Sequence, residues 1–276
     1  MTPPPDAPTG PATAAVVTGA ARGIGRGIAE RLVARGHRVV VTDVDAAGAA
    51  RTATEIGAAE GLAHDVRDPN AHRRVAEAAA RHGRLVAWFN NAGVGWDGDL
   101  ADLADEQVRG LVEVNLLGVL WGTRAALDAF GPEGGDVVQT ASLSGLGPVP
   151  GLSVYAATKA AVVSLTMSVQ AETPAGVRVH ALCPDGVATA LLEAMRDDGR
   201  ASQLVHSGGR ILSVDEIAEA AVALLGSRRV VRTIPTRRGA LMRAATLAPS
   251  LAQHSFGLLA AQGRVRVRAR RRGGGG

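Results

Sequence analysis

The stretch Thr18-Gly19-Ala20-Ala21-Arg22-Gly23-Ile24-Gly25 follows a short apolar run at 14–18 and opens a segment of helical character at 23–35. Glycines let the chain turn sharply and let a phosphate approach the backbone, because no Cβ stands in the way. The first turn of the next helix then offers unpaired N–H groups to an anion. The spacing predicts a strand–turn–helix unit that binds a pyrophosphate; an ordinary glycine-rich turn is the alternative.

Around this unit, short apolar runs alternate with longer helical segments. The runs are nearly continuous, as in strands covered on both faces, and their order predicts an α/β fold with a mostly parallel, doubly wound sheet flanked by helices. We expect strands at 14–18, 38–42, 61–64, 85–89, 136–141 and 177–183, with 230–234 as a further candidate. We expect helices at 23–35, 46–56, 69–81, 103–130 and 153–172. Ligands bind such sheets outside the carboxyl ends of the strands.

Two charged side chains bear on the choice of cofactor. Asp43 follows the second expected strand, about twenty residues beyond the glycine loop, where a carboxylate accepts hydrogen bonds from adenosine ribose hydroxyls and repels a 2′-phosphate. Arg22, inside the loop, favours the opposite choice, because a guanidinium binds such a phosphate. We give Asp43 more weight, so NAD is predicted over NADP.

The only tyrosine and the only lysine of the chain are Tyr155 and Lys159. On a helix, residues four apart share a face. An ammonium close to a phenol stabilises the phenolate, and the positive nicotinamide ring of an oxidised cofactor adds to this effect. With both present, we expect the pKa of Tyr155 to fall from its usual value of about 10 to near 7. Taken alone, a pair with this spacing is more often a surface Tyr and Lys, and the remaining motifs decide between the two interpretations.

Together these motifs resemble the short-chain dehydrogenase/reductase (SDR) family of Rossmann-fold oxidoreductases, from about residue 12 to residue 227. Asn90-Asn91-Ala92-Gly93 matches the element that ends the fourth strand, and Pro184-Asp185-Gly186 resembles the motif around the nicotinamide, with Asp185 where glycine is more usual. The resemblance implies a set of cofactor-binding residues: Gly19, Arg22, Gly23, Ile24, Gly25, Asp43, Asp65, Val66, Asn91, Ala92, Gly93, Tyr155, Lys159, Pro184, Val187 and Thr189.

The same resemblance implies four catalytic residues, namely Asn115, Ser142, Tyr155 and Lys159. Tyr155 would act as general acid/base while a hydride passes between nicotinamide and a carbinol or carbonyl carbon. Lys159 would also bind the nicotinamide ribose, Ser142 would donate to the substrate oxygen, and Asn115 would hold a water on the proton path. Taken alone, Ser142 is more typical of a turn cap and Asn115 of a helix kink.

The substrate pocket implied by the resemblance is apolar and favours a secondary alcohol or ketone of lipid, steroid, terpenoid or aromatic type. Its expected side chains are Val94, Trp96, Leu143, Leu146, Pro148, Leu152, Leu191, Leu192 and Met195. The prediction is an oxidoreductase that uses NAD(H). An NADPH-dependent ketone or 3-oxoacyl reductase is the alternative within the family. A dinucleotide-binding sensor or membrane-associated scaffold is the non-enzymatic alternative, and it would be expected to lack the tyrosine or the lysine.

Composition sets the remaining expectations. The chain has 276 residues, a single cysteine, and seven histidines without metal-ligand spacing, so no metal site is predicted and a cytoplasmic protein is expected. Six of the 30 basic residues lie in 263–276, leaving 24 basic and 26 acidic side chains in 1–262, which argues against specific nucleic-acid binding. We expect a disordered Pro-rich lead-in at 1–12, a Rossmann domain at 13–235, and an atypical extension at 236–276.

The extension departs from the family pattern, because the ending that packs many SDR tetramers is missing. A homodimer through the helices expected at 103–130 and 153–172 is therefore predicted instead. For the extension itself, one interpretation is a helix over the substrate entrance followed by a disordered Arg-rich tail. The other is peripheral association with an anionic membrane, with apolar side chains in lipid and arginines on headgroups.

Overall fold

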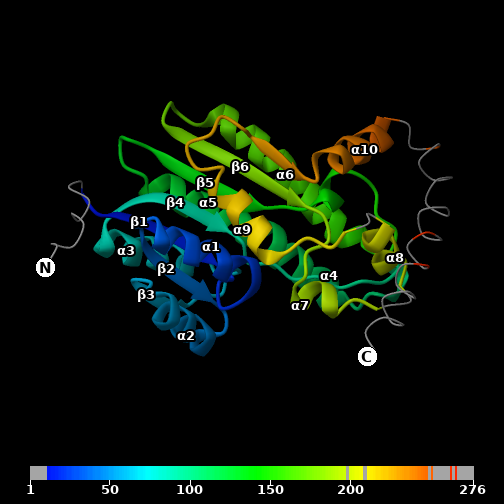
Figure 1. Cartoon of the computed structure of the whole chain (residues 1–276), viewed down its shortest axis with the longest axis horizontal. Helices are drawn as coiled ribbons and strands as arrows, with labels where there is room; N and C mark the ends of the chain where they lie inside the picture. Colours follow the sequence, from blue (N-terminus) through cyan, green and yellow to red (C-terminus); the bar gives the residue numbers. More distant parts are fainter. Residues whose placement is uncertain are drawn as a thin grey trace, which may run out of the picture.

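The structure, a computed structural model, describes residues 11–196, 199–207 and 210–247, together with Ser250, Gln262 and Val265. Seven parallel strands form one sheet in the order β3-β2-β1-β4-β5-β6-β7 (Figure 1). Their bounds are β1 Thr13–Thr18, β2 Arg38–Asp43, β3 Glu60–Ala63, β4 Arg84–Asn90, β5 Gly135–Thr140, β6 Val177–Pro184 and β7 Val231–Ile234. The strand order reverses between β1 and β4, and this switch point is where a doubly wound sheet binds its ligand.

Helices cover both faces of the sheet, as the sequence predicts. The helices are α1 Gly23–Ala34, α2 Ala46–Ile56, α3 Pro69–His82, α4 Asp105–Val112, α5 Gly118–Ala129, α6 Ser153–Glu172, α7 Ala190–Glu193, α8 Arg200–Ser207, α9 Val214–Val222 and α10 Thr236–Leu247. Helices α1, α2 and α9 pack on one face, and α3, α5 and α6 on the other. Figure 1 shows α7 and α8 beyond the carboxyl ends of the strands.

The helix expected at 103–130 is present and continuous from Asp105 to Ala129, but its middle turn is π-helical, which the sequence analysis did not predict. The chain forms α4, a π-helical segment η2 at Glu113–Leu117, and then α5. The wider turn is stabilised by Asn115, whose amide bonds in both directions with the backbone of Val94, and it ends where Gly118 packs closely on Val66. A π-bulge inside a helix often occurs at a functional site.

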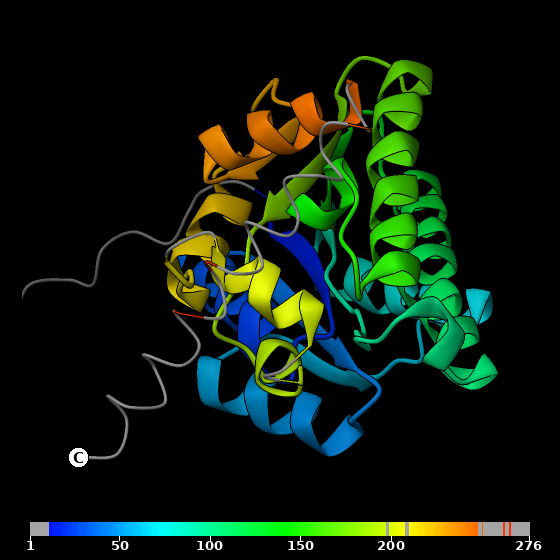
Figure 2. The same ribbon diagram turned by 90° about the vertical axis from the view of Figure 1, so that its right-hand side faces the viewer.

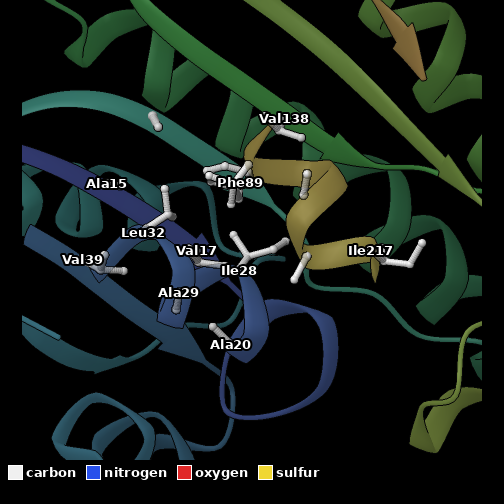
Figure 3. Packing of buried hydrophobic residues seen from close by; sticks show 14 of the residues in the cluster. Ala15, Val17, Ala20, Ile28, Ala29, Leu32, Val39, Phe89, Val138 and Ile217 are labelled. Carbon is white, nitrogen blue, oxygen red and sulfur yellow. The ribbon is translucent and has the colours of Figure 1, made fainter. Parts of the chain in front are cut away.

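Fully buried apolar side chains fix the position of the first strand–turn–helix unit (Figure 3). Ile28 and Leu32 of α1 pack with Val17 of β1, Phe89 of β4 and Ile217 of α9. Burying side chains of this size contributes roughly 1.5–3 kcal/mol each, so α1 is held firmly on the sheet. The glycine loop between β1 and α1 is therefore short and supported at both ends.

The C-terminal helix α10 is part of the fold. Met242 packs with Leu143 and Leu146 of the 3₁₀ turn η3 (Leu143–Leu146), and a Cβ added at Gly239 would lie 2.5 Å from the Cβ of Thr233 in β7. In Figure 2, α10 (orange) lies above the gold and yellow helices α9 and α8. The predictions for residues 1–10 and for the Arg-rich stretch fall outside the described residues. Among the described helices, none has the length and apolarity that a membrane span requires.

Candidate active site

The glycine loop is packed so closely that larger residues would not fit. Gly19 has a φ of 62°, and a Cβ there would lie 2.6 Å from the Cα of Ala92. A Cβ at Gly25 would collide with the carbonyl oxygen of Gly19. Helix α1 begins at Gly23, and no described side chain caps its first turn, which leaves N–H groups free for an anion.

The Asn-Asn-Ala-Gly element is bonded directly to this loop. The hydroxyl oxygen of Thr18 accepts hydrogen bonds from the backbone N–H groups of Asn91 and Ala92, both at 3.0 Å. The side-chain amide of Asn91 donates to the carbonyl oxygens of Thr18 at 3.1 Å and Gly19 at 3.0 Å. These hydrogen bonds therefore hold the ends of β1 and β4 together at the switch point.

Asp43 lies beside the loop with its carboxylate held in place. One carboxylate oxygen accepts from the N–H of Ala21 at 3.1 Å, and the other accepts from the N–H of Asp45 at 3.1 Å. Both oxygens keep lone pairs for further donors. Arg22 is exposed at the edge of the same cavity, so both residues that bear on cofactor choice face one space.

The segment after β3 lines the neighbouring part of the cavity. Asp65 forms an ion pair with Arg67 at 2.6 Å, and hydrogen bonding from Arg67 lowers the pKa of the Asp65 carboxyl. Val66 is buried against Gly118. His64 and Arg67 also line the cavity, and the sequence analysis missed both. Their place directly beside the Asp65-Val66 pair was the signal that could have identified them.

Tyr155 and Lys159 lie on one face of α6 and both line the cavity. Lys159 is only 4% exposed, and its Nζ donates to the carbonyl oxygen of Thr140, at the end of β5, at 2.8 Å. Ser142 lies next to Tyr155, where its hydroxyl acts to lower the pKa of the phenol, and the same hydroxyl oxygen accepts from the N–H of Ser144 at 3.1 Å. Ser142 is thus both a turn cap and a neighbour of the phenol.

The expected lowering of the Tyr155 pKa includes the effect of the oxidised nicotinamide ring and stays a prediction, whereas in the protein without cofactor the shift is in the opposite direction. Burial raises the pKa of Tyr155 to about 12, and the neighbouring hydroxyl of Ser142 opposes this only in part. Burial also lowers the pKa of Lys159 to about 8. Low-dielectric surroundings disfavour the charged form of each group, and this effect sets the direction of both shifts.

Asn115 is fully buried, and both polar atoms of its side chain form hydrogen bonds. Its Oδ1 accepts from the N–H of Val94 and its Nδ2 donates to the carbonyl oxygen of Val94, both at 2.9 Å. A Cβ added at Gly93 would lie 3.2 Å from Asn115 Oδ1 and 3.7 Å from Lys159 Nζ. The side chain therefore holds the loop after β4 next to Lys159. The expected role of Asn115 in holding a water on the proton path stays a prediction.

One cavity of about 990 Å³ is lined by most of the residues described so far, including Gly19, Asp43, Tyr155 and Lys159. Gly25 and Asn115 are not among its lining residues. The expected cofactor residues Pro184, Val187 and Thr189 line it. So do six of the expected substrate residues, namely Val94, Trp96, Leu152, Leu191, Leu192 and Met195. Leu143 and Leu146 were expected there, but they are buried in the core beneath α10. Pro148 is not among the lining residues, whereas Ser144, Gly186 and Val205 are additional ones.

The described residues contain no group of histidine, cysteine or acidic side chains that could hold a metal ion. The Tyr155 phenol, the Lys159 ammonium, Ser142 and the glycine loop all line the cavity.

The family model for short chain dehydrogenases matches residues 13–200, which include the glycine loop, Tyr155 and Lys159. The chain belongs to the short-chain dehydrogenase/reductase family. Its relatives include a 3-oxoacyl-[acyl-carrier-protein] reductase of Salmonella typhimurium, 35% identical over 77% of this chain and 89% of the relative. A 2,5-dichloro-2,5-cyclohexadiene-1,4-diol dehydrogenase of Sphingobium indicum is also 35% identical, over 76% of this chain and 88% of the relative.

A solved member of the SDR family has the same fold. The SDR of Burkholderia phymatum in complex with NAD superposes with a TM-score of 0.77 and 27% identity, over 87% of this chain and 95% of that one. Both the sequence match and the structural match extend over most of the sheet. Membership of the SDR family makes this protein an oxidoreductase with a Rossmann fold.

Proposed function

We propose that this SDR transfers a hydride between NAD(H) and a secondary alcohol or ketone with apolar substituents. The observation that carries the proposal is the shared cavity, in which the glycine loop and Asp43 lie at one end and the Tyr155–Lys159 pair lies next to an apolar wall. The expected domain, residues 13–235, contains all of these groups.

The residues present fit a dinucleotide. The loop at Gly19 and Gly25 leaves no room for side chains, and the N-terminus of α1 offers N–H groups to a pyrophosphate. Asp43 would accept hydrogen bonds from ribose hydroxyls and repel a 2′-phosphate, which favours NAD. When bound, the nicotinamide ring supplies or accepts the hydride.

The chain's own groups would handle the proton and the substrate oxygen. Tyr155 would exchange a proton with that oxygen, and Ser142, next to Tyr155, would donate a second hydrogen bond to it. Lys159 would stabilise the phenolate and bind the nicotinamide ribose, while its bond to Thr140 fixes the ammonium in position. Asn115 would keep the loop at Val94 in register with this pair.

Apolar side chains favour an apolar substrate. Trp96, Leu191, Leu192 and Met195 line the cavity, and a wall of this kind stabilises hydrocarbon surface more than sugar or phosphate groups. The Sphingobium relative is named for oxidation of a chlorinated cyclic diol, which is a secondary alcohol of this kind.

An NADPH-dependent ketone or 3-oxoacyl reductase is the second candidate. Arg22 is exposed at the edge of the cavity, within the glycine loop, where a guanidinium would bind a 2′-phosphate. The Salmonella relative is named as a reductase of 3-oxoacyl groups. A sensor or scaffold without catalysis is disfavoured because the chain keeps both Tyr155 and Lys159.

A homodimer and a cytoplasmic location complete the proposal. Helix α6 exposes small side chains and one methionine along a single stripe, namely Ala157, Ala160, Ser164 and Met167. A stripe of small side chains lets the helices of two copies approach closely. Sedimentation of the purified chain would test this part of the proposal.

The decisive experiment measures cofactor binding and turnover separately. Trp96 lines the cavity, so its fluorescence should change when NADH binds, and titrations with NADH and NADPH would give both affinities. A Trp96→Phe variant would show whether the fluorescence change comes from Trp96. We expect tighter binding of NADH and turnover of apolar secondary alcohols with NAD. Tighter binding of NADPH, with turnover of ketones only, would favour the second candidate.

A further inference from the structure

Arg238, in the first turn of α10, joins three segments that are far apart in the sequence. Its Nε lies 2.9 Å from Oδ2 of Asp185, the residue directly after β6. Its Nη2 donates to the carbonyl oxygen of Leu204 at 2.8 Å and to the hydroxyl of Ser207 at 3.4 Å. Leu204 and Ser207 lie in the last turn of α8, so one guanidinium links α10, α8 and the end of β6.

This link is largely shielded from water. The side chain of Asp185 is 10% exposed and that of Arg238 is 21% exposed. Removing one partner of a buried ion pair leaves an uncompensated charge and is strongly unfavourable. The planar guanidinium donates in several directions at once, which an ammonium on a flexible stem does not reproduce. Its positive charge also lies at the carboxyl end of α8, where the helix dipole favours a cation.

The linked segments form part of the candidate site. Val205 of α8 lines the cavity, and a Cβ added at Gly186 would collide with the Cγ1 of Val205, so α8 lies directly on the loop after β6. Asp185 and Gly186 line the same cavity. The N–H of Leu212 donates to the carbonyl oxygen of Gly186 at 2.8 Å, which holds that loop from the other side.

Helix α10 provides a fixed base for Arg238. Gly239, the next residue, packs closely on Thr233 of β7, and Met242 packs with the core cluster of η3. The core therefore holds α10, and α10 in turn holds α8 through Arg238. This places the side chain of Val205 in the wall of the cavity.

We propose that Arg238 is a positioning residue for the substrate, which clamps α8 against the loop at Asp185 and thereby shapes the apolar end of the cavity. The extension that departs from the family pattern would then act in substrate binding through this one contact. The inference rests on the proposed function only where substrate turnover is the readout.

The test compares Arg238→Met and Asp185→Asn with Arg237→Met. Arg237 is the exposed neighbour on the same helix, so its variant removes an equal charge outside the clamp. Asp185→Asn removes the negative charge but keeps the shape of the side chain. It therefore still tests the clamp if Arg238→Met fails to fold. We expect amide hydrogen exchange in residues 200–207 to speed up about tenfold in both clamp variants, with the control unchanged.

Kinetics separate positioning from a purely structural role. The clamp variants should raise KM for an apolar alcohol about tenfold, with kcat and the KM for NAD within about threefold of wild type. The double variant should be no worse than Arg238→Met alone, because that change already removes the ion pair with Asp185 together with both bonds to α8. Arg238→Lys should restore only part of the loss.

Two results would overturn the clamp. The first is unchanged exchange in 200–207 in both variants, and the second is faster exchange with an unaltered substrate KM. A wild-type protein without dehydrogenase or reductase activity would instead count against the proposed function, and the exchange measurement would still decide whether Arg238 holds α8.

Discussion

The Nζ of Lys159 lies 5.6 Å from the centre of the Tyr155 ring, on the same face of α6, and the chain contains no other lysine or tyrosine. Each side chain can therefore be titrated without interference from a second residue of its kind. The two pKa values are shifted in opposite directions by burial, upward for the phenol and downward for the ammonium. The ammonium alone does not activate the phenol, so a bound cofactor has to change this balance.

Tyrosinate absorbance should report Tyr155 alone. Without cofactor we expect ionisation near pH 12, because burial disfavours the phenolate. Saturation with NAD should lower this pKa, since the positive nicotinamide ring attracts the phenolate. A free-protein pKa close to the usual value of about 10 would contradict the burial argument. An unchanged pKa on adding NAD would contradict activation by the cofactor.

Tyr155→Phe removes the hydroxyl and keeps the ring. Turnover should fall by about a thousandfold or more, while NADH affinity should stay within about threefold, because the glycine loop is untouched. Stopped assays at high enzyme concentration, together with a fluorescence titration, would measure both. A variant that keeps a tenth of wild-type activity would exclude Tyr155 as the acid/base.

Lys159 should give stability an unusual pH dependence. Its pKa is about 8 in the folded protein against a usual 10.5. Between these values the unfolded chain holds a proton that the folded chain has lost, so stability should rise with pH by as much as about 3 kcal/mol across the window. Urea unfolding of wild type and Lys159→Met from about pH 7.5 to pH 9.5 would test this, below the range where Tyr155 ionises in the unfolded chain. If the unfolding free energy rose equally with pH in wild type and in Lys159→Met, the lowered pKa of Lys159 would be contradicted.

The carboxylate of Asp43 should decide whether the enzyme prefers NAD or NADP. Asp43→Ser removes the charge that repels a 2′-phosphate, so the NAD:NADP ratio of kcat/KM should fall about tenfold or more, with Arg22 then free to bind the phosphate. Asp45→Ser is the matched control, because it removes a charge two residues away and keeps an oxygen that can cap α2, as Asp45 does through Gly48. A wild-type preference for NADP would show that Arg22 outweighs Asp43.

Local patterns in the sequence were enough to predict most of the fold. Apolar runs located the strands within one or two residues, and α2 and α6 have the predicted bounds, because periodicity and glycine placement are local signals. What these patterns did not predict is the π-helical turn inside the helix at 103–130, because it depends on a contact between Asn115 and Val94 that no local pattern contains. The glycine loop, Asp43 and the Tyr155–Lys159 pair were also singled out by their spacing, and they line one cavity, while their roles stay predictions.

Tertiary structure decided what depends on burial and on distant neighbours. The pKa shifts of Tyr155 and Lys159 come from the low dielectric of the folded interior, which the sequence does not express. Whether Leu143 faces substrate or core was set by the packing of α10. The contact of Arg238 with Asp185 joins residues 53 positions apart in the printed sequence. Sequence spacing determines which groups share a helix face or a turn, whereas only the folded chain determines which of them lose water and meet each other.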